Sequence, residues 1–305
     1  MDLIQKELLE QVADLHGVPA GAYNIRANGK SAARNTTANV DIVSKEDVQG
    51  IDIIIKPGTK QESVHIPVVM SQSGLTDMVY NDFHIGEDCD IVIVAGCGIH
   101  NGGDSMSKHD GVHTFYVGKN SKVRYVEKHY GSGEGTGERV MNPETVIHME
   151  ENSSFYMDTV QIRGVDSTNR VTTADLKAGA KLEISEKLMT HGKQEARTAF
   201  TVDLDGEGSS ANVVSRSVAR GESFQDFRAK INGNTACAGH SECDAIIMDD
   251  ARVVATPELE ANNIDAELIH EAAIGKIAGE QLIKLMTLGL TEAEAEEMII
   301  SGFLK

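Results

Sequence analysis

The feature that most restricts the fold is a short unit that recurs along the chain from residue 51 onward. Each copy contains an apolar residue, then a turn with Gly or Asn, then a second apolar run. Such a unit buries its apolar side only against its neighbours, which is typical of repeat architectures. Consecutive copies start 30, 32, 32, 27, 28, 27 and 28 residues apart, at Ile55, Ile85, Val117, Met149, Leu176, Leu204, Ile231 and Leu259.

The segments between these turns have the composition of β-strands. Residues 89–95 (CDIVIVA) and 122–130 (KVRYVEKHY) are rich in β-branched and aromatic residues, and several such runs alternate apolar with polar positions. We therefore predict a mainly β protein, a parallel β-helix (solenoid) in which each coil contributes about two strands. A β-sandwich has similar strand spacing, but the steady period of 27 or 28 residues in the second half favours the solenoid.

Helical patterns occur only near the two ends of the chain. Residues 2–15 have apolar residues at helical spacing, with Gly17 and Pro19 as stop signals. Near the other end, a helix is expected from Ala272 to Leu288 and a second from Glu292 to Phe303, which a Thr291–Glu294 capping box precedes. We therefore expect an N-terminal helical and irregular segment (1–47), a β-helix core (48–268) and a C-terminal helical segment (269–305).

Composition excludes several classes of function. A formal net charge of −19 repels phosphate backbones, so nucleic acid is not expected as a partner. No run of 18 apolar residues occurs, and the N-terminus lacks the basic and apolar regions of a secretory signal, so we expect a cytoplasmic protein outside the membrane. The absence of Trp disfavours a β-helix polysaccharide lyase or hydrolase with an aromatic-lined cleft.

The best candidate for a chemical site is the segment that contains Cys237, His240 and Cys243, followed thirty residues later by His270 and Glu271. Thiolate, imidazole and carboxylate groups bind iron and zinc. In an extended strand the two cysteines face one side and His240 faces the other, unless the strand bends at the intervening glycine. The alternatives are an ordinary buried cysteine at position 243 and a surface pair at a helix start for His270 and Glu271.

A second Cys/His cluster contains Cys97, His100, His109 and His113. Its spacing is loose and a loop-like stretch interrupts it, so a metal or active-site role is a weaker hypothesis here. The Gly-rich residues 131–137 do not precede a helix, and we expect a flexible loop there rather than a phosphate site.

Four stretches near the C-terminus carry a family resemblance. They are Cys243-Asp-Ala-Ile-Ile-Met-Asp-Asp, Ile269-His-Glu-Ala-Ala-Ile-Gly-Lys-Ile, Gly289-Leu-Thr-Glu-Ala-Glu-Ala and Ile299-Ile-Ser-Gly-Phe. In these motifs the chain resembles the SufB/SufD family, the scaffold subunits of the SUF system for iron–sulfur cluster assembly. The resemblance covers roughly residues 23–305 and is nearest to the short members from archaea and anaerobic bacteria.

The resemblance implies a right-handed parallel β-helix that pairs end to end with a second copy, as a homodimer. It also implies a transient iron–sulfur cluster at or near the dimer interface. A SufC-like ABC ATPase would dock on the C-terminal helices, and the family's functional Glu-His-Glu falls on Ile269-His270-Glu271. The residues expected to contact the ATPase are Ile277, Leu282, Leu285, Met298 and Phe303.

One departure from the family bears on the mechanism. SufB proper has a sulfur-accepting cysteine shortly after the Cys-Asp motif, but residues 251–256 (ARVVAT) contain none. Cys237 or Cys243 could replace it, sulfur could arrive differently, or the chain could be a SufD-like structural subunit without a cluster. We expect a non-catalytic assembly scaffold, with cluster ligands drawn from Cys237, Cys243, His240, His270 and Glu271.

Overall fold

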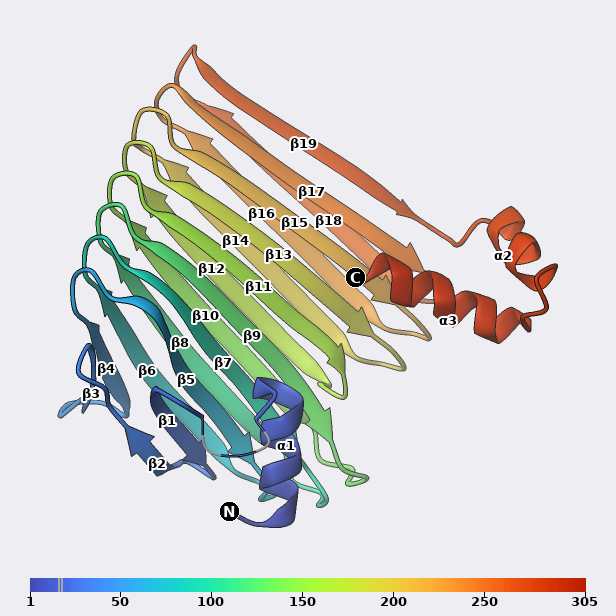
Figure 1. Ribbon diagram of the computed structural model, residues 1–305. Coiled ribbons are helices and arrows are strands. Elements are labelled where there is room, and N and C mark those ends of the chain that lie inside the picture. Colours follow the sequence, from blue (N-terminus) through green and yellow to red (C-terminus); the bar gives the residue numbers. More distant parts are fainter. Residues whose placement is uncertain (16, 18) are drawn as a thin grey trace.

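The fold is a parallel β-solenoid with one helix at the N-terminus and two at the C-terminus, as Figure 1 shows for a computed structural model. The structure describes residues 1–15, 17 and 19–305. The predicted fold class is therefore confirmed. The three helices are α1 (Leu3–Ala13), α2 (Gly279–Met286) and α3 (Glu292–Phe303).

Two sheets form the walls of the solenoid, and each complete coil gives one strand to each sheet. The first sheet has the order β19-β17-β15-β13-β11-β9-β7-β5-β1-β2, and the second has β18-β16-β14-β12-β10-β8-β6-β4-β3. In the first sheet the strands are β1 (Ala22–Ala27), β2 (Lys30–Asn35), β5 (Lys60–Met70), β7 (Asp90–His100), β9 (Lys122–Ser132), β11 (Ser154–Arg163), β13 (Lys181–Thr190), β15 (Ser210–Ala219), β17 (Cys237–Ile247) and β19 (Ala266–Gly275). In the second they are β3 (Val40–Ser44), β4 (Gly50–Ile55), β6 (Thr76–Ile85), β8 (Ser107–Val117), β10 (Arg139–Met149), β12 (Ser167–Leu176), β14 (Glu195–Leu204), β16 (Phe224–Gly233) and β18 (Arg252–Ala261).

The core lies between the two sheets and is built from ladders of equivalent residues in successive coils. Phe155, for example, pairs with Val123 on one side and with Leu182 on the other. Aromatic rings also meet across coils, because Phe83 stacks on Phe115 with ring centroids 4.4 Å apart. Complete burial of such a side chain contributes about 1.5–3 kcal/mol, so the apolar ladders stabilise the solenoid along its length.

The recurring turn of the sequence is the corner where the chain passes from the second sheet to the first. Asp88, Asn120 and Asn152 occupy this corner in consecutive coils with φ of 56°, 58° and 58°. Gly179 and Gly208 take the same place in later coils, with φ of 67° and 71°. Only Gly, Asn and Asp adopt this left-handed conformation at low cost, which explains why these five coils have one of them at the corner.

The N-terminal segment contains more strand than the sequence predicted. The stretch expected to be irregular forms β1, β2 and β3: β1 pairs with β5, β2 pairs with β1, and β3 pairs with β4. These strands are short and lie among many polar residues, so their few buried apolar residues, such as Ile25, Val40 and Ile42, gave only a weak strand pattern. Helix α1 packs on the outer face of β7, where Gly96 and Gly98 leave room for Val12 and Leu8.

The C-terminal segment also begins differently from the expectation. The helix predicted from Ala272 starts only at Gly279, because β19 continues to Gly275 and pairs residue for residue with β17. This backbone pairing outweighs the local helical pattern. Helix α3 has the predicted bounds, and the Thr291–Glu294 capping box is present.

Candidate functional site

The candidate ligands lie on β17 and β19, neighbouring strands at the C-terminal end of the solenoid. In the ladder between them, His240 is opposite Ile269, Ser241 is opposite His270, and Glu242 is opposite Glu271. His270 and Glu271 therefore belong to the last strand of the sheet and not to a helix start.

The structure separates the five predicted ligands into two groups. Burial alternates along β17, so Cys237 and Cys243 face the interior while His240 faces outward, as the sequence predicted. His270 shares the inner face and Glu271 shares the outer one. Cys237 and Cys243 are six residues apart on one strand, which is roughly 20 Å, so they cannot bind the same small group.

The inner group consists of Cys243, Ser241 and His270. The Cys243 side chain is 1% exposed. Burial, and secondarily the nearby Glu186 carboxylate, raises the pKa of the Cys243 thiol to about 12. Nδ1 of His270 lies 2.7 Å from Oγ of Ser241, which fixes the ring on the inner face, two residues along the ladder from Cys243.

The outer group consists of His240, Glu271 and a residue that the sequence did not single out, Glu242. Nδ1 of His240 lies 2.8 Å from Oδ1 of Asn212, and its Nε2 lies 3.6 Å from Oε2 of Glu271. One potential ligand atom from each of His240, Glu242 and Glu271 lies within 4.8 Å of the others. Alternation could have revealed Glu242, because it is two residues beyond His240 and directly opposite Glu271.

Both groups lie beside the open end of the solenoid. Strands β18 and β19 form the last coil, and most of their side chains are exposed or half-buried on both faces. Strand β19 pairs with β17 on one side only, so its other edge offers backbone N–H and C=O groups.

The C-terminal helices place the five predicted docking residues in different surroundings. Ile277 and Phe303 pack against Val218 and other side chains of the solenoid. Leu282 and Leu285 are half-buried, and Met298 is 53% exposed. The other apolar side chains that α2 and α3 and their connection leave exposed are Ile283, Met286 and Leu288.

The second Cys/His cluster is inside the solenoid. Cys97, His109 and His113 come together there, whereas His100 bonds to Ser132 elsewhere, with Nδ1 3.1 Å from Oγ. Burial opposes ionisation of Cys97, but His109 and His129 reverse this effect and lower the pKa of its thiol to about 7.

Three buried charged residues beside this cluster were not anticipated: Glu127, His129 and Arg170. Nη1 of Arg170 donates to Oε2 of Glu127 over 2.6 Å, and Nε of Arg170 lies 3.8 Å from Oε1 of Glu186. All three residues occupy positions where strand alternation predicts an inward side chain. Inward positions are normally apolar, however, so the sequence pattern gave no indication that charged side chains would lie there.

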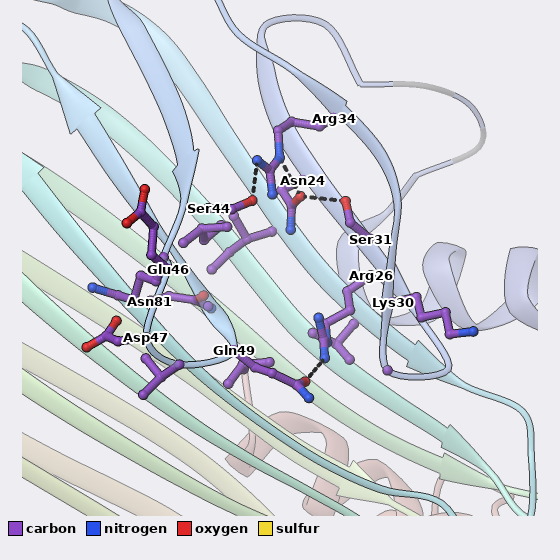
Figure 2. A pocket seen from close by; sticks show the side chains of 18 residues that line it. Asn24, Arg26, Lys30, Ser31, Arg34, Ser44, Glu46, Asp47, Gln49 and Asn81 are labelled. Carbon is purple, nitrogen blue, oxygen red and sulfur yellow. Dashed lines mark hydrogen bonds between the residues drawn. The ribbon is translucent and has the colours of Figure 1, made fainter.

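The other end of the solenoid holds an open, polar pocket of about 580 Å³, shown in Figure 2. Arg26, Lys30 and Arg34 line it, and Arg26 donates to Oε1 of Gln49. Arg26 also donates to both carboxylate oxygens of Asp77, over 2.8 and 2.6 Å. This pocket is separated from the β17–β19 site by the whole row of coils (Figure 1).

Comparison with known protein families shows to which family the chain belongs. Residues 70–303 match the family model for the SUF system FeS cluster assembly, SufBD core domain. The chain belongs to the SufBD family.

Curated SufBD relatives come from several archaea. An iron–sulfur cluster assembly SufBD family protein of Archaeoglobus fulgidus is 31% identical over 85% of this chain and 69% of its own length. A relative from Methanothermobacter thermautotrophicus is 29% identical over 85% of the chain, which spans 63% of that protein. One from Pyrococcus horikoshii is 28% identical over 92% of the chain and 86% of its own length. Resemblance to the family, inferred from the C-terminal motifs, is thereby confirmed.

None of the helices within residues 1–15, 17 and 19–305 has the length and apolar content needed to cross a bilayer.

Proposed function

We propose that this SufBD protein is a scaffold on which an iron–sulfur cluster is assembled at the open end of the solenoid. Cys243 would supply the thiolate, with His270 beside it on the inner face and Glu271 at the edge strand. The observation that carries the proposal is the ladder that places Cys243 and His270 on the same inner face of neighbouring strands, two residues out of step. The four cysteines of the protein are free thiols, which is consistent with the proposed function in the reducing cytoplasm.

Cluster binding at Cys243 requires a movement of the last coil. The thiol is almost completely buried, and its raised pKa keeps it protonated at neutral pH. Iron binds the thiolate form of cysteine and displaces the thiol proton. An iron ion must therefore be able to enter and reach the Cys243 sulfur itself. Strand β19 covers Cys243 from one side only, and displacement of this strand would expose the thiol and the half-buried His270, whereas Glu271 is already exposed.

The geometry also ranks the remaining predicted ligands. Cys237 is at the far end of β17, so we do not assign it to the same cluster. His240 is on the outer face with Glu242 and Glu271, where an incoming ferrous ion could be held before it passes to the inner face. Glu271 belongs to the outer group, so it would reach a cluster at Cys243 only if the edge strand moves.

We further propose that a SufC-like ABC ATPase docks on the C-terminal helices. The contact would be made by the exposed apolar side chains Ile283, Met286, Leu288 and Met298, which are 62%, 43%, 77% and 53% exposed. Ile277 and Phe303, which pack on the solenoid, would transmit the motion of the helices to its last coils. Arg220 of the solenoid pairs with Glu297 of α3 and adds a second connection.

A second copy of the chain is the proposed occupant of the β18–β19 end. Its own β19 edge would satisfy the unpaired backbone groups and cover the exposed inner face of the last coil. The alternative role is a SufD-like structural subunit without a cluster, for which the lack of a cysteine in residues 251–256 is the main support.

An anaerobic experiment separates the two roles. The chain is co-expressed with its ATPase, and iron, sulfide and the visible spectrum are measured for the wild type, Cys243→Ser and Cys237→Ser. The proposal expects a cluster in the wild type and in Cys237→Ser, and its loss in Cys243→Ser while the ATPase remains bound. A complex without iron and sulfide in all three samples would support the structural-subunit role.

A further inference from the structure

The outer face of β17 and β19 holds a group of potential metal ligands that crosses from one strand to the other. His240 and Glu242 are on β17, and Glu271 is on β19 directly opposite Glu242. One ligand atom from each of the three lies within 4.8 Å of the others. His240 and Glu242 are half-buried and Glu271 is exposed, so an ion from solution can reach all three.

The imidazole of His240 is held in the form that binds a metal. Its Nδ1 lies 2.8 Å from Oδ1 of Asn212, which is opposite it on the neighbouring strand β15. Because an amide oxygen only accepts hydrogen bonds, Nδ1 carries the proton and Nε2 has the free electron pair. An acceptor on the second ring nitrogen is the usual partner of a metal-binding histidine. Nε2 of His240 is therefore available as a ligand on the side of Glu271.

The distance between His240 and the Glu271 carboxylate also fits one shared ion. Nε2 of His240 lies 3.6 Å from Oε2 of Glu271, which is too long for a hydrogen bond. Two ligand atoms that each lie about 2.0–2.2 Å from a tetrahedral ion are about 3.3–3.6 Å apart. An ion can thus join these two atoms without a rearrangement of the backbone.

The two carboxylates have no cation of their own among the residues that the structure describes. Within that part of the chain, neither Glu242 nor Glu271 forms an ion pair with a lysine or an arginine. The position opposite Glu242 on β15 is Val214, and Arg216 lies two residues further on, opposite Asp244. The negative charge of the pair is therefore open to a cation from solution.

A second trio with similar spacing shows the difference. Asp52, Asp82 and His84, on β4 and β6, also have ligand atoms within 4.8 Å of one another. Nζ of Lys45 lies 2.7 Å from Oδ1 of Asp52 and 2.8 Å from Oδ2 of Asp82, so the chain itself supplies the cation there. We therefore assign an ion to the trio on β17 and β19 and not to this one.

We propose that His240, Glu242 and Glu271 bind one divalent transition-metal ion that fastens the edge strand β19 to β17. One imidazole and two carboxylates suit ferrous iron, zinc or manganese. The imidazole disfavours magnesium and calcium, which prefer oxygen ligands alone. Water would complete the coordination, because the group faces the solvent.

The site exists only while β19 is paired with β17. Displacement of β19 carries Glu271 away from His240 and Glu242, so the open last coil binds the ion more weakly. By the same linkage, a bound ion favours the paired state. The opening that uncovers Cys243 therefore also releases the ion close to the thiol, since Cys243 follows Glu242 in the chain. This last step rests on the proposed function, whereas the ion site and the fastening of β19 do not.

Ion binding is measured in full-length Cys243→Ser protein made without the ATPase, so that no cluster forms at position 243. Equilibrium dialysis with Zn²⁺, and with Fe²⁺ under anaerobic conditions, should give one ion per chain. Added His240→Gln or Glu242→Gln should weaken binding by about tenfold or more, since even a partner of a metal ligand is worth about that much. His148→Gln is the matched control and should bind like the parent, because His148 is also a surface histidine beside a carboxylate, that of Asp175.

Hydrogen exchange of the same proteins measures the fastening of β19. Zn²⁺ should slow the exchange of the backbone amides of residues 266–275 in the parent and in His148→Gln, but not in His240→Gln or Glu242→Gln. Mg²⁺ should not slow it in any of them. Exchange of the other strands reports whether each variant is folded. In protein that keeps Cys243, Zn²⁺ should also slow alkylation of this thiol, followed by mass spectrometry, and His240→Gln should remove the protection.

Three results would overturn the proposal. A parent protein that holds no ion, or that holds it equally well after His240→Gln, would show that the outer group is not the site. Exchange of residues 266–275 that does not change with bound Zn²⁺ would show that the ion does not fasten β19. Protection of Cys243 that persists in His240→Gln would show that zinc binds the thiol itself. The iron and sulfide content of the co-expressed complex reports on cluster assembly separately, so the two proposals fail independently.

Discussion

Replacement of Arg170 by Met should destabilise the solenoid strongly, because Arg170 is the buried cation of a polar cluster inside the solenoid. The Arg170 side chain is 4% exposed, and its guanidinium lies between Glu127 and Glu186, whose side chains are 2% and 5% exposed. Methionine fills much of the volume but leaves two buried carboxylates without a cation.

The expected loss is about 3–5 kcal/mol of unfolding free energy, the usual cost of removing one partner from a buried ion pair. We do not double this value for the second carboxylate, because both retain other donors. Glu186 accepts hydrogen bonds from Thr198 over 3.0 Å and from Ser215 over 2.7 Å. Glu127 still accepts one from the Tyr125 hydroxyl over 3.0 Å.

The loss should depend on pH with a definite sign. In the wild type, burial acts to raise the pKa of Glu127, but Arg170, followed by His129, holds it well below its ordinary value. Glu127 therefore stabilises the wild type above its unfolded-state pKa, and this contribution disappears as the pH falls. In Arg170→Met no guanidinium opposes the effect of burial, so the pKa of Glu127 in the folded state rises. Protonation of Glu127 at low pH then removes the cost of its buried, unpaired charge. The difference in unfolding free energy between the wild type and Arg170→Met should therefore narrow on acidification.

The assay is urea unfolding followed by far-UV circular dichroism, from pH 7 down to the lowest pH at which both proteins fold. Arg228→Met is the matched control, because Arg228 pairs with Asp226 on the surface and is 66% exposed. This control should unfold like the wild type. An Arg170→Met protein as stable as the control at pH 7, or a difference that does not change with pH, would refute the reasoning.

Two further predictions concern backbone positions. Gly98→Val should release α1, because an added Cβ would lie only 3.1 Å from Cβ and Cδ2 of Leu8. Hydrogen exchange of the backbone amides of residues 3–13 should then accelerate. Gly275→Val is the control and should not have this effect, because the space around Gly275 is open. Asn120→Val should lower the free energy of unfolding by about 1–2 kcal/mol, because Asn120 has a φ of 58°, which a β-branched residue adopts only under strain. Asn120→Gly should be close to neutral in the same urea unfolding assay. Equal losses for the two variants would contradict the role assigned to this turn.

Local patterns revealed the repeat and its corner, but they failed where pairing between distant segments decides the structure. Residues 272–275 have a helical pattern and nevertheless form a strand, since their backbone groups find partners on β17. The short strands β1 to β3 were missed because their few buried apolar residues gave only a weak pattern. In both places pairing with another segment, which the local pattern does not show, decides the structure.

Strand alternation likewise predicted one part of the candidate site and could not predict another. It placed Cys243 inward and His240 outward on β17, as the structure confirms. It could not show that His270 and Glu271 also divide between the two faces, because the sequence placed them at a helix start. Glu242 was missed since its neighbours across the ladder were unknown.

The sequence alone determined the class of fold, the position of the turns and membership of the SufBD family, because a period of 27 to 32 residues and the C-terminal motifs are local properties of the chain. Only the tertiary structure decided which side chains meet. Cys97 and His129 are 32 positions apart, and His109 joins them from the opposite sheet. The coil length sets which residues stack, and the gap between the two sheets sets which residues face one another, so neither relation can be seen in a single strand.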